Sequence, residues 1–320
     1  MNDAGPPVSL RGRDLLSAAD LSRPEVELVF GRAAALKAEF RATRRHVDLP
    51  LVGRTLAMLF QKPSLRTRVT FEAGMTQLGG HAVHLATSDV GLGARESVAD
   101  VARNLDRWVD GIVVRTFDQA VVEELAEAAG IPVINALTDL EHPCQALADL
   151  FTLRERFGAV DGLGLAYVGD GNNVCHSLLL LGARLGLDLR VAHPEGYGPD
   201  PEIVARARVI AAETGGRIVL VADPRDAVGG AAVIYTDAWT SMGQEAETER
   251  RRADFAGFRV DEPLRRAAGP STLVMHCLPA HRDEEIAAEV LDGPFSVVLD
   301  QAENRLHVQK TFLAESLEGR

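Results

Sequence analysis

Apolar and polar positions along this chain follow two spacings in turn, which predicts strands that alternate with helices. Residues 55–60 are a short apolar run typical of a buried strand, and Phe71, Met75 and Leu78 then recur at helical spacing. The predicted elements of the first half are a helix at 25–45, strands at 55–60, 81–85, 111–115 and 132–135, and helices near 67–78, 97–108, 119–129 and 145–157. Residues 1–24 are polar and contain Pro and Gly, which predicts a frayed segment or a short helix.

A second series of the same kind begins after Asp161-Gly162. Its predicted strands are 164–168, 188–192, 217–221, 233–236, 272–276 and 295–299, and residues 303–317 form a terminal helix. Strands that alternate with helices make parallel sheets covered on both faces. The predicted fold class is α/β, with two doubly wound domains that meet near residue 150.

The densest polar cluster of the first half stands where a strand passes into a helix. Ser64, Arg66, Thr67 and Arg68 fall between the strand 55–60 and the helix that follows. Free N–H groups at a helix start attract anions, and hydroxyl and guanidinium groups suit phosphate oxygens. Ser64 could instead be a simple helix cap with both arginines on a solvated surface. Two arginines among the hydroxyls favour a phosphate site.

Other chemically capable residues also follow predicted strands, where ligands bind in doubly wound sheets. Each has a plainer interpretation as a salt bridge, helix cap, tight turn or buried thiol, so the prediction rests on their joint occurrence. The residues concerned are Arg115, His142-Pro143-Cys144-Gln145, Gly169 to Asn173, Asp237 to Gly243, His276-Cys277-Leu278-Pro279 and Arg305.

Charge and cysteine content limit the classes of function. The net charge of −12 argues against general binding to nucleic acid or membrane surfaces, and lysine is scarce. Cys144, Cys175 and Cys277 are odd in number and widely spaced, as in proteins of a reducing compartment. A signal peptide and a membrane-spanning run are both absent from the sequence, which predicts a cytoplasmic protein.

The residue types favour group transfer without a cofactor or metal. No nucleophile elbow, Walker loop or metal-ligand set is present in the sequence, and His81 and His84 have no partner positioned to complete a metal site. A phosphate cradle together with carbonyl-directed donors suits direct transfer from a phosphorylated donor to an amine.

Four motifs, in this order along the chain, resemble those of the ornithine carbamoyltransferases. They are Ser64-Leu65-Arg66-Thr67-Arg68, His142-Pro143-Cys144-Gln145, Asp237-x-Trp239-x-Ser241-Met242-Gly243 and His276-Cys277-Leu278-Pro279. The first two are shared with the aspartate enzymes, and the last two are more specific to the ornithine branch. The likeness runs from about residue 50 to residue 310.

The resemblance implies a carbamoyl phosphate-binding domain at 1–148, with the helix at about 304–320 packing back on it, and an ornithine-binding domain at 149–303. Carbamoyl phosphate is expected at Ser64, Leu65 (through its backbone), Arg66, Thr67, Arg68, Arg115, His142, Gln145, Cys277, Leu278 and Arg305. L-ornithine is expected at Asn173, Asp237, Ser241 and Met242. The resemblance also implies homotrimers or multiples of trimers, and no cofactor.

The expected catalytic residues are Cys277, Asp237, Arg115 and His142. Asp237 orients the δ-amine of ornithine and Cys277 assists its deprotonation, while Arg115 and His142 stabilise charge on the carbonyl oxygen. The charged segment 243–258 is expected either to close over ornithine or to be an ordinary exposed helix.

Two positions depart from the family pattern. Leu65 stands where many members carry Thr, although other carbamoyltransferases have Leu there. Gly91 replaces a Gln or His that reaches into the neighbouring subunit, which leaves open which residue crosses that boundary.

Other functions remain to be weighed. Putrescine and N-acylornithine are alternative acceptors, whereas aspartate would need basic groups near Asp237. A nucleotide-binding oxidoreductase is disfavoured because Gly169 to Asn173 lacks the dinucleotide-binding glycine pattern. The set of polar groups also argues against an inactive interaction protein.

Overall fold

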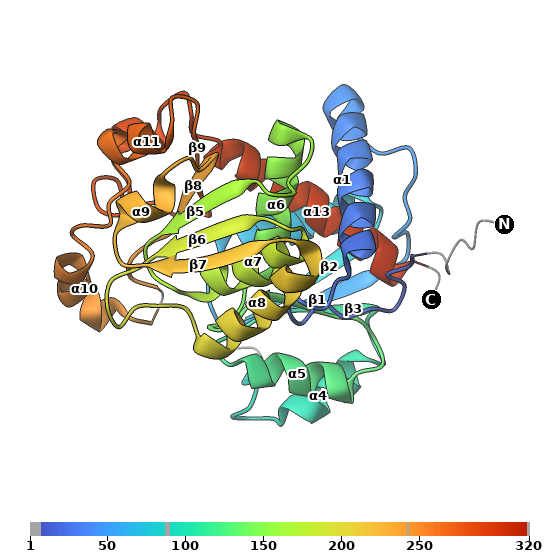
Figure 1. Ribbon diagram of the computed structural model, residues 1–320. Helices are drawn as coiled ribbons and strands as arrows, with labels where there is room; N and C mark the ends of the chain where they lie inside the picture. Colours follow the sequence, from blue (N-terminus) through green and yellow to red (C-terminus); the bar gives the residue numbers. More distant parts are fainter. Residues whose placement is uncertain (1–7, 87–89, 242, 319–320) are drawn as a thin grey trace. The chain divides into compact units, whose positions relative to one another are not determined.

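A computed structural model describes residues 8–86, 90–241 and 243–318 (Figure 1). The chain divides into two compact units. The first contains the residues up to Leu147 together with those from Arg305 onward, and the second contains Ala148–Asn304. Helices α6 and α13 include the points at which the chain passes from one unit to the other.

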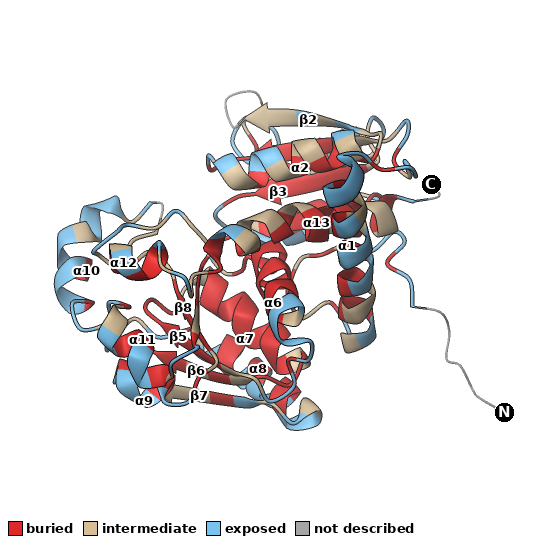
Figure 2. Ribbon diagram, turned by 90° about the horizontal axis from the view of Figure 1, so that it is seen from above, coloured by how far each residue is buried: buried red, intermediate tan, exposed pale blue. Residues whose placement is uncertain are grey.

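The first unit is built on a four-stranded parallel sheet in the order β2-β1-β3-β4. Its strands are β1 (Thr55–Phe60), β2 (His81–Ala86), β3 (Gly111–Arg115) and β4 (Val133–Leu137). Its helices are α1 (Arg23–Thr43), α2 (Leu65–Gln77), α4 (Val98–Leu105), α5 (Gln119–Ala128) and the adjoining parts of α6 (Pro143–Phe157) and α13 (Val298–Leu317). β2 is an edge strand and is only half-buried (Figure 2).

Alternate side chains of the first sheet pack against different helices, because successive residues of a strand point to opposite faces. Ala57 and Leu59 of β1, with Ile112 and Val114 of β3, join the apolar residues of α4 and α5 in one core cluster. Figure 1 shows α4 and α5 together on this side of β1 and β3. The buried side of α1 is formed mainly by its apolar residues Val26, Val29, Phe30, Ala33 and Phe40.

The second unit contains a five-stranded parallel sheet in the order β7-β6-β5-β8-β9. The strands are β5 (Gly164–Val168), β6 (Asp188–Ala192), β7 (Arg217–Val221), β8 (Val233–Thr236) and β9 (Leu273–His276). The helices are α7 (Asn173–Arg184), α8 (Pro201–Thr214), α9 (Pro224–Val228), η1 (Glu245–Glu247), α10 (Thr248–Asp254), α11 (Glu262–Ala268) and α12 (Ala288–Leu291).

Helices cover both faces of the second sheet. Ala166 and Val168 of β5 pack in one core cluster with residues of α9 and α11. α7 packs along α8, and nearly every residue of α7 is buried (Figure 2). A helix that is apolar on all sides, such as Leu178–Leu181 in α7, belongs in a protein interior. The predicted α/β fold with two parallel sheets is confirmed.

The strand order of each sheet reverses direction at one point, which is where doubly wound sheets bind ligands. In the first sheet the reversal lies between β1 and β3, and Phe60 pairs with Arg115 at its carboxyl edge. In the second it lies between β5 and β8, where Tyr167 pairs with Tyr235. Of the predicted polar residues, Ser64 to Arg68 follow β1, Arg115 ends β3, Asn173 follows β5 and Asp237 follows β8.

One predicted strand is wrong. Residues 295–299 form a single bridge, Val274 with Ser296, and α13 begins at Val298. The apolar run Val297-Val298-Leu299 has strand composition, but it leads directly into the first turn of that helix. Arg305 lies inside α13, in agreement with the predicted helix at 303–317, but that helix begins five residues earlier, where the strand was expected.

The amino-terminal prediction is also wrong for the residues that the structure describes. Leu10, Leu15 and Leu21 are buried, and Leu15 bridges to Ile134 beside β4. These leucines anchor residues 8–22 on the first unit. Among the described helices, none combines the length and the apolar character that a membrane crossing requires.

Candidate active site

The first turn of α2 carries the predicted phosphate cradle. Ser64 is the N-cap of α2, and its hydroxyl oxygen accepts a hydrogen bond from the Thr67 N–H at 3.2 Å. Arg66 is half-buried. Arg68 is exposed, and its Nε donates to Glu72 Oε1 at 2.9 Å on the next turn. An anion that recruits Arg68 therefore competes with an existing ion pair.

Arg305 joins three of the predicted residues in the first unit. Arg305 is 2% exposed. One nitrogen donates to Thr67 Oγ1 at 2.8 Å, and the other contacts Gln145 Oε1 and lies 3.4 Å from His142 Nε2. Residues from α2, the start of α6 and α13 thus meet at one guanidinium, although Arg305 lies 160 positions from Gln145 and 238 from Thr67 in the chain.

The charge around His142 is positive. Burial lowers the pKa of His142 well below its usual value, and the guanidiniums of Arg305, Arg115 and Arg66 lower it further. His142 is therefore neutral at physiological pH and can donate or accept a hydrogen bond without adding charge. Three arginines near a neutral imidazole make a local site for an anion in a protein of net negative charge.

Cys144, although it lies in the same motif, does not belong to this cluster chemically. Its side chain is buried, and burial raises the pKa of its thiol to about 12. The thiol donates to the backbone oxygen of Asn135 at 3.4 Å. A thiol of this kind is a packing group and not a nucleophile.

In the second unit, Asp237 and Cys277 are in direct contact. The Cys277 thiol donates to Asp237 Oδ1 at 2.8 Å, and both side chains are half-buried. Asp237 directly follows β8, and Cys277 directly follows β9, its neighbour in the sheet. The predicted pair of a carboxylate and a thiol therefore comes together at the carboxyl edge of the sheet.

His276 holds the backbone that follows Cys277. The Leu278 N–H donates to His276 Nδ1 at 2.8 Å, so this nitrogen is the acceptor and Nε2 carries the proton. His276 Nε2 lies 3.2 Å from Glu285 Oε1, and both side chains are fully buried. Gln301 Oε1 accepts the His276 N–H at 3.0 Å. The sequence interpretation missed Glu285 and Gln301, which no motif marks.

Comparison with known families accounts for both units. Residues 13–155 match the carbamoyl-phosphate-binding domain of the aspartate/ornithine carbamoyltransferases, and residues 161–315 match the Asp/Orn-binding domain of the same family. The chain belongs to the aspartate/ornithine carbamoyltransferase family.

Relatives within this family are similar over nearly the whole chain. An ornithine carbamoyltransferase of Symbiobacterium thermophilum is 57% identical over 305 residues, which cover 95% of this chain and 98% of that protein. One from Thermococcus kodakarensis is 52% identical over 312 residues, or 98% of each chain. The solved structure of the Pyrococcus furiosus ornithine carbamoyltransferase matches with a TM-score of 0.94 at 51% identity, covering 97% of this chain and 99% of that one. The resemblance given by the four motifs is confirmed.

The remaining residues predicted for the acceptor side of this carbamoyltransferase are Asn173, Ser241 and Met242. Asn173 is the first residue of α7 and is half-buried. Ser241 is half-buried, and its N–H donates to Gln244 Oε1 at 3.0 Å. Met242 lies outside the described residues. Their contacts with ornithine stay predictions.

The segment 243–258 is anchored at its carboxyl end. Arg251 of α10 is 6% exposed and donates to Asp170 Oδ2 at 3.0 Å and to the Trp239 backbone oxygen at 2.8 Å. Phe255 is fully buried and stacks on Trp239. Any closure over ornithine therefore involves residues 243–247 more than α10, and closure stays a prediction.

Asp237, His276 and Cys277 place ligand-type atoms within 4.8 Å of one another. Both nitrogens of His276 are engaged, by Leu278 and by Glu285. A metal ion could use this histidine only by displacing one of them, so the geometry does not favour a three-ligand metal site here.

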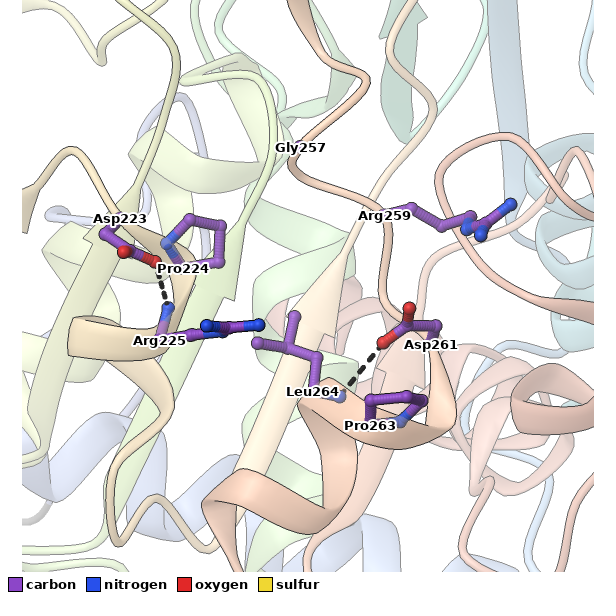
Figure 3. A pocket seen from close by; sticks show the side chains of 8 residues that line it. All are labelled: Asp223, Pro224, Arg225, Gly257, Arg259, Asp261, Pro263 and Leu264. Atoms are coloured by element: carbon purple, nitrogen blue, oxygen red, sulfur yellow. Dashed lines mark hydrogen bonds between the residues drawn. The ribbon is translucent and has the colours of Figure 1, made fainter.

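A small cavity of about 160 Å³ lies at the starts of α9 and α11 (Figure 3). Asp223 and Asp261 cap these helices, and their carboxylates are bonded to Arg225 N–H and Leu264 N–H. None of the predicted site residues lines it. The lining residues are Asp223, Pro224, Arg225, Gly257, Arg259, Asp261, Pro263 and Leu264.

Proposed function

We propose that this carbamoyltransferase transfers the carbamoyl group of carbamoyl phosphate to the δ-amine of L-ornithine, giving L-citrulline and phosphate. The observation that carries the proposal is the likeness to ornithine carbamoyltransferases over nearly the full chain, at up to 57% identity. A relative from Pyrococcus furiosus, 51% identical, is an anabolic ornithine carbamoyltransferase, which supports a role in arginine biosynthesis.

The first unit is proposed to bind carbamoyl phosphate. The Arg305-centred cluster supports this, because three arginines surround a neutral imidazole there. Arg66, with the first N–H groups of α2, neutralises the phosphate, while Arg115, His142 and Thr67 receive the carbonyl oxygen. The full proposed set is Ser64, Leu65, Arg66, Thr67, Arg68, Arg115, His142, Gln145 and Arg305, with Cys277 and Leu278 from the second unit.

The second unit is proposed to bind ornithine through Asn173, Asp237, Ser241 and Met242. The δ-ammonium must lose a proton before its lone pair can attack. The carboxylate of Asp237 attracts the amine, and the adjacent Cys277 thiol provides a polar group to assist that proton transfer. A C–N bond then forms, and the C–O bond to phosphate breaks with its electron pair leaving on the phosphate. The attacking nitrogen gives up its second proton to the departing phosphate, which leaves as hydrogen phosphate.

A trimer or a multiple of trimers, located in the cytoplasm, is proposed as the working assembly. Large apolar side chains of the first unit support it: Leu65 is 76% and Trp108 is 71% exposed in the single chain. Exposed side chains of this size are typical of surfaces that bind another chain.

Citrulline formation from carbamoyl phosphate tests the proposal against the alternative acceptors. Purified protein is assayed with ornithine, putrescine, N-acetylornithine and aspartate. We expect kcat/KM for ornithine to exceed the others by at least tenfold, and loss of most of that activity in Asp237→Asn. A preference for putrescine or N-acetylornithine would overturn the acceptor while leaving the reaction class in place.

A further inference from the structure

The carboxylate of Asp237 is held on both of its oxygens. Oδ1 accepts the Cys277 thiol at 2.8 Å and the Ala238 N–H at 2.8 Å. Oδ2 accepts a hydrogen from the side-chain amide of Asn172, Nδ2, at 2.8 Å. Asn172 therefore determines where the second oxygen points, and with it the plane of the carboxylate.

The orientation of the Asn172 amide follows from its neighbours. Oδ1 lies 3.0 Å from the Val174 N–H and 3.2 Å from the Cys175 N–H, the first free donors of α7. Backbone N–H groups can only donate, so the atom facing them must be the amide oxygen. The NH₂ group is thereby forced toward Asp237.

A buried tyrosine also holds the Asn172 amide in this orientation. Tyr167 is buried, stacks on Tyr235, and donates its hydroxyl to Asn172 Oδ1 at 3.2 Å. Burial, followed by the negative charge of Asp237, raises the pKa of Tyr167 well above its usual value. Its hydroxyl therefore keeps its proton and remains a donor over the whole working range of pH.

We propose that Asn172 is a positioning residue for the reaction: it fixes the Asp237 carboxylate in contact with Cys277 and ready for the incoming amine. The inference rests on the proposed function and goes beyond it, because the stretch Gly169 to Asn173 was singled out as a whole and Asn172 itself was given no role. α7 supplies the rigid support, since its N-terminal N–H groups lock the amide that holds the carboxylate.

Two substitutions separate this role from helix capping. Asn172→Ser keeps a cap acceptor for α7 but is too short to reach Asp237. Asn172→Asp also keeps the cap acceptor, but it sets a second carboxylate against Asp237 Oδ2. Two adjacent carboxylates resist joint ionisation. We expect Asn172→Ser to lower kcat 10- to 100-fold with the KM for carbamoyl phosphate unchanged, and Asn172→Asp to move the acidic limb of the kcat–pH profile to higher pH.

Asp200→Ala is the matched control, because Asp200 caps α8 by accepting from the Glu202 N–H and Ile203 N–H. Asn172→Ala and Asp200→Ala should lower Tm by similar amounts, but only Asn172→Ala should lower kcat. Asn172→Ser with wild-type kcat and Asn172→Asp with an unshifted pH profile would together overturn the proposal.

A chemical readout keeps this inference separate from the proposed function. Cys144 and Cys175 are buried with raised pKa values, so iodoacetamide at pH 8 should label Cys277 first. In Asn172→Ser the Asp237 carboxylate is no longer held against the Cys277 thiol, so the thiol should ionise more easily and labelling should be faster. In Asn172→Asp the second negative charge should disfavour the thiolate, so labelling should be slower. If the wild type makes no citrulline, the function fails, and equal labelling rates in all three proteins would refute the inference on its own.

Discussion

At the scale of single residues, Arg66 is the half-buried arginine of the predicted phosphate cradle at the start of α2. Its charge is close enough to His142 to lower the pKa of that imidazole. We expect Arg66→Ala to lower kcat by 100- to 1,000-fold, about 3–4 kcal/mol of transition-state stabilisation, because the charge that receives the departing phosphate is lost. Steady-state kinetics and circular dichroism together measure the effect. Arg103→Ala removes an exposed arginine paired with Asp100 and should change neither. Normal turnover by a well-folded Arg66→Ala protein would disprove the role.

His142, which belongs to the same cluster, makes the folding stability depend on pH. Its pKa in the folded protein lies well below 6.5, because of burial and the nearby arginines, so below pH 6.5 the unfolded chain binds a proton that the folded protein does not. The free energy of unfolding therefore falls as the pH falls below 6.5, by up to about 1.4 kcal/mol per pH unit.

His142→Gln cannot take up that proton. We expect its urea-unfolding free energy to fall less than that of the wild type between pH 7 and pH 5. The lost contact with Arg305 shifts the variant's curve by a constant amount and does not change its slope. Parallel pH dependences of the two proteins would show that His142 does not titrate as inferred.

At the scale of elements, Gly171 shows how closely the turn before α7 is packed. A Cβ on Gly171 would lie 2.1 Å from the Pro199 nitrogen and 2.3 Å from the Gly198 carbonyl carbon, both backbone atoms that cannot rotate away. Gly31 in α1 has nothing within 4 Å. We expect Gly171→Ala to destabilise by at least about 1–3 kcal/mol, and Gly31→Ala to stabilise by up to about 1 kcal/mol. Thermal unfolding measures both, and equal Tm values would contradict the packing argument.

The elements that could be predicted are those whose signal is local. Runs such as 55–60 and 164–168 are strands because buried parallel strands are apolar throughout. The site residues were predicted just after such strands because ligands bind at strand ends in doubly wound sheets. Residues 295–299 have a similar apolar composition but form no strand. Val298 and Leu299 are already the first two residues of α13.

Contacts between residues that are distant in the sequence could not be predicted from a local pattern. Asn172 and Asp237 are 65 positions apart, and only the folded chain brings the Asn172 amide to that carboxylate. The Glu285–His276 contact spans nine positions, but only the turn of the chain between them brings the two side chains together. Motifs thus gave the predicted reacting groups, Asp237 and Cys277, but not Asn172 and Glu285, which contact Asp237 and His276.

At the scale of the whole molecule, the open question is how many chains make the working enzyme. The first unit exposes Leu65 and Val69 one turn apart on α2, together with Val83 of the edge strand β2 and Trp108. Apolar groups of this size in water are unfavourable, and a closed ring of identical chains would bury them.

We expect light scattering to give a mass of about 103 kDa, three chains of 34.4 kDa, or a multiple of it. Dilution that lowers the mass should lower the specific activity in parallel, because the resemblance puts the carbamoyl phosphate site near a subunit boundary. Val69→Glu, outside the proposed site, should favour smaller species, and Arg103→Ala should not. A fully active monomer would show that each chain completes its own site.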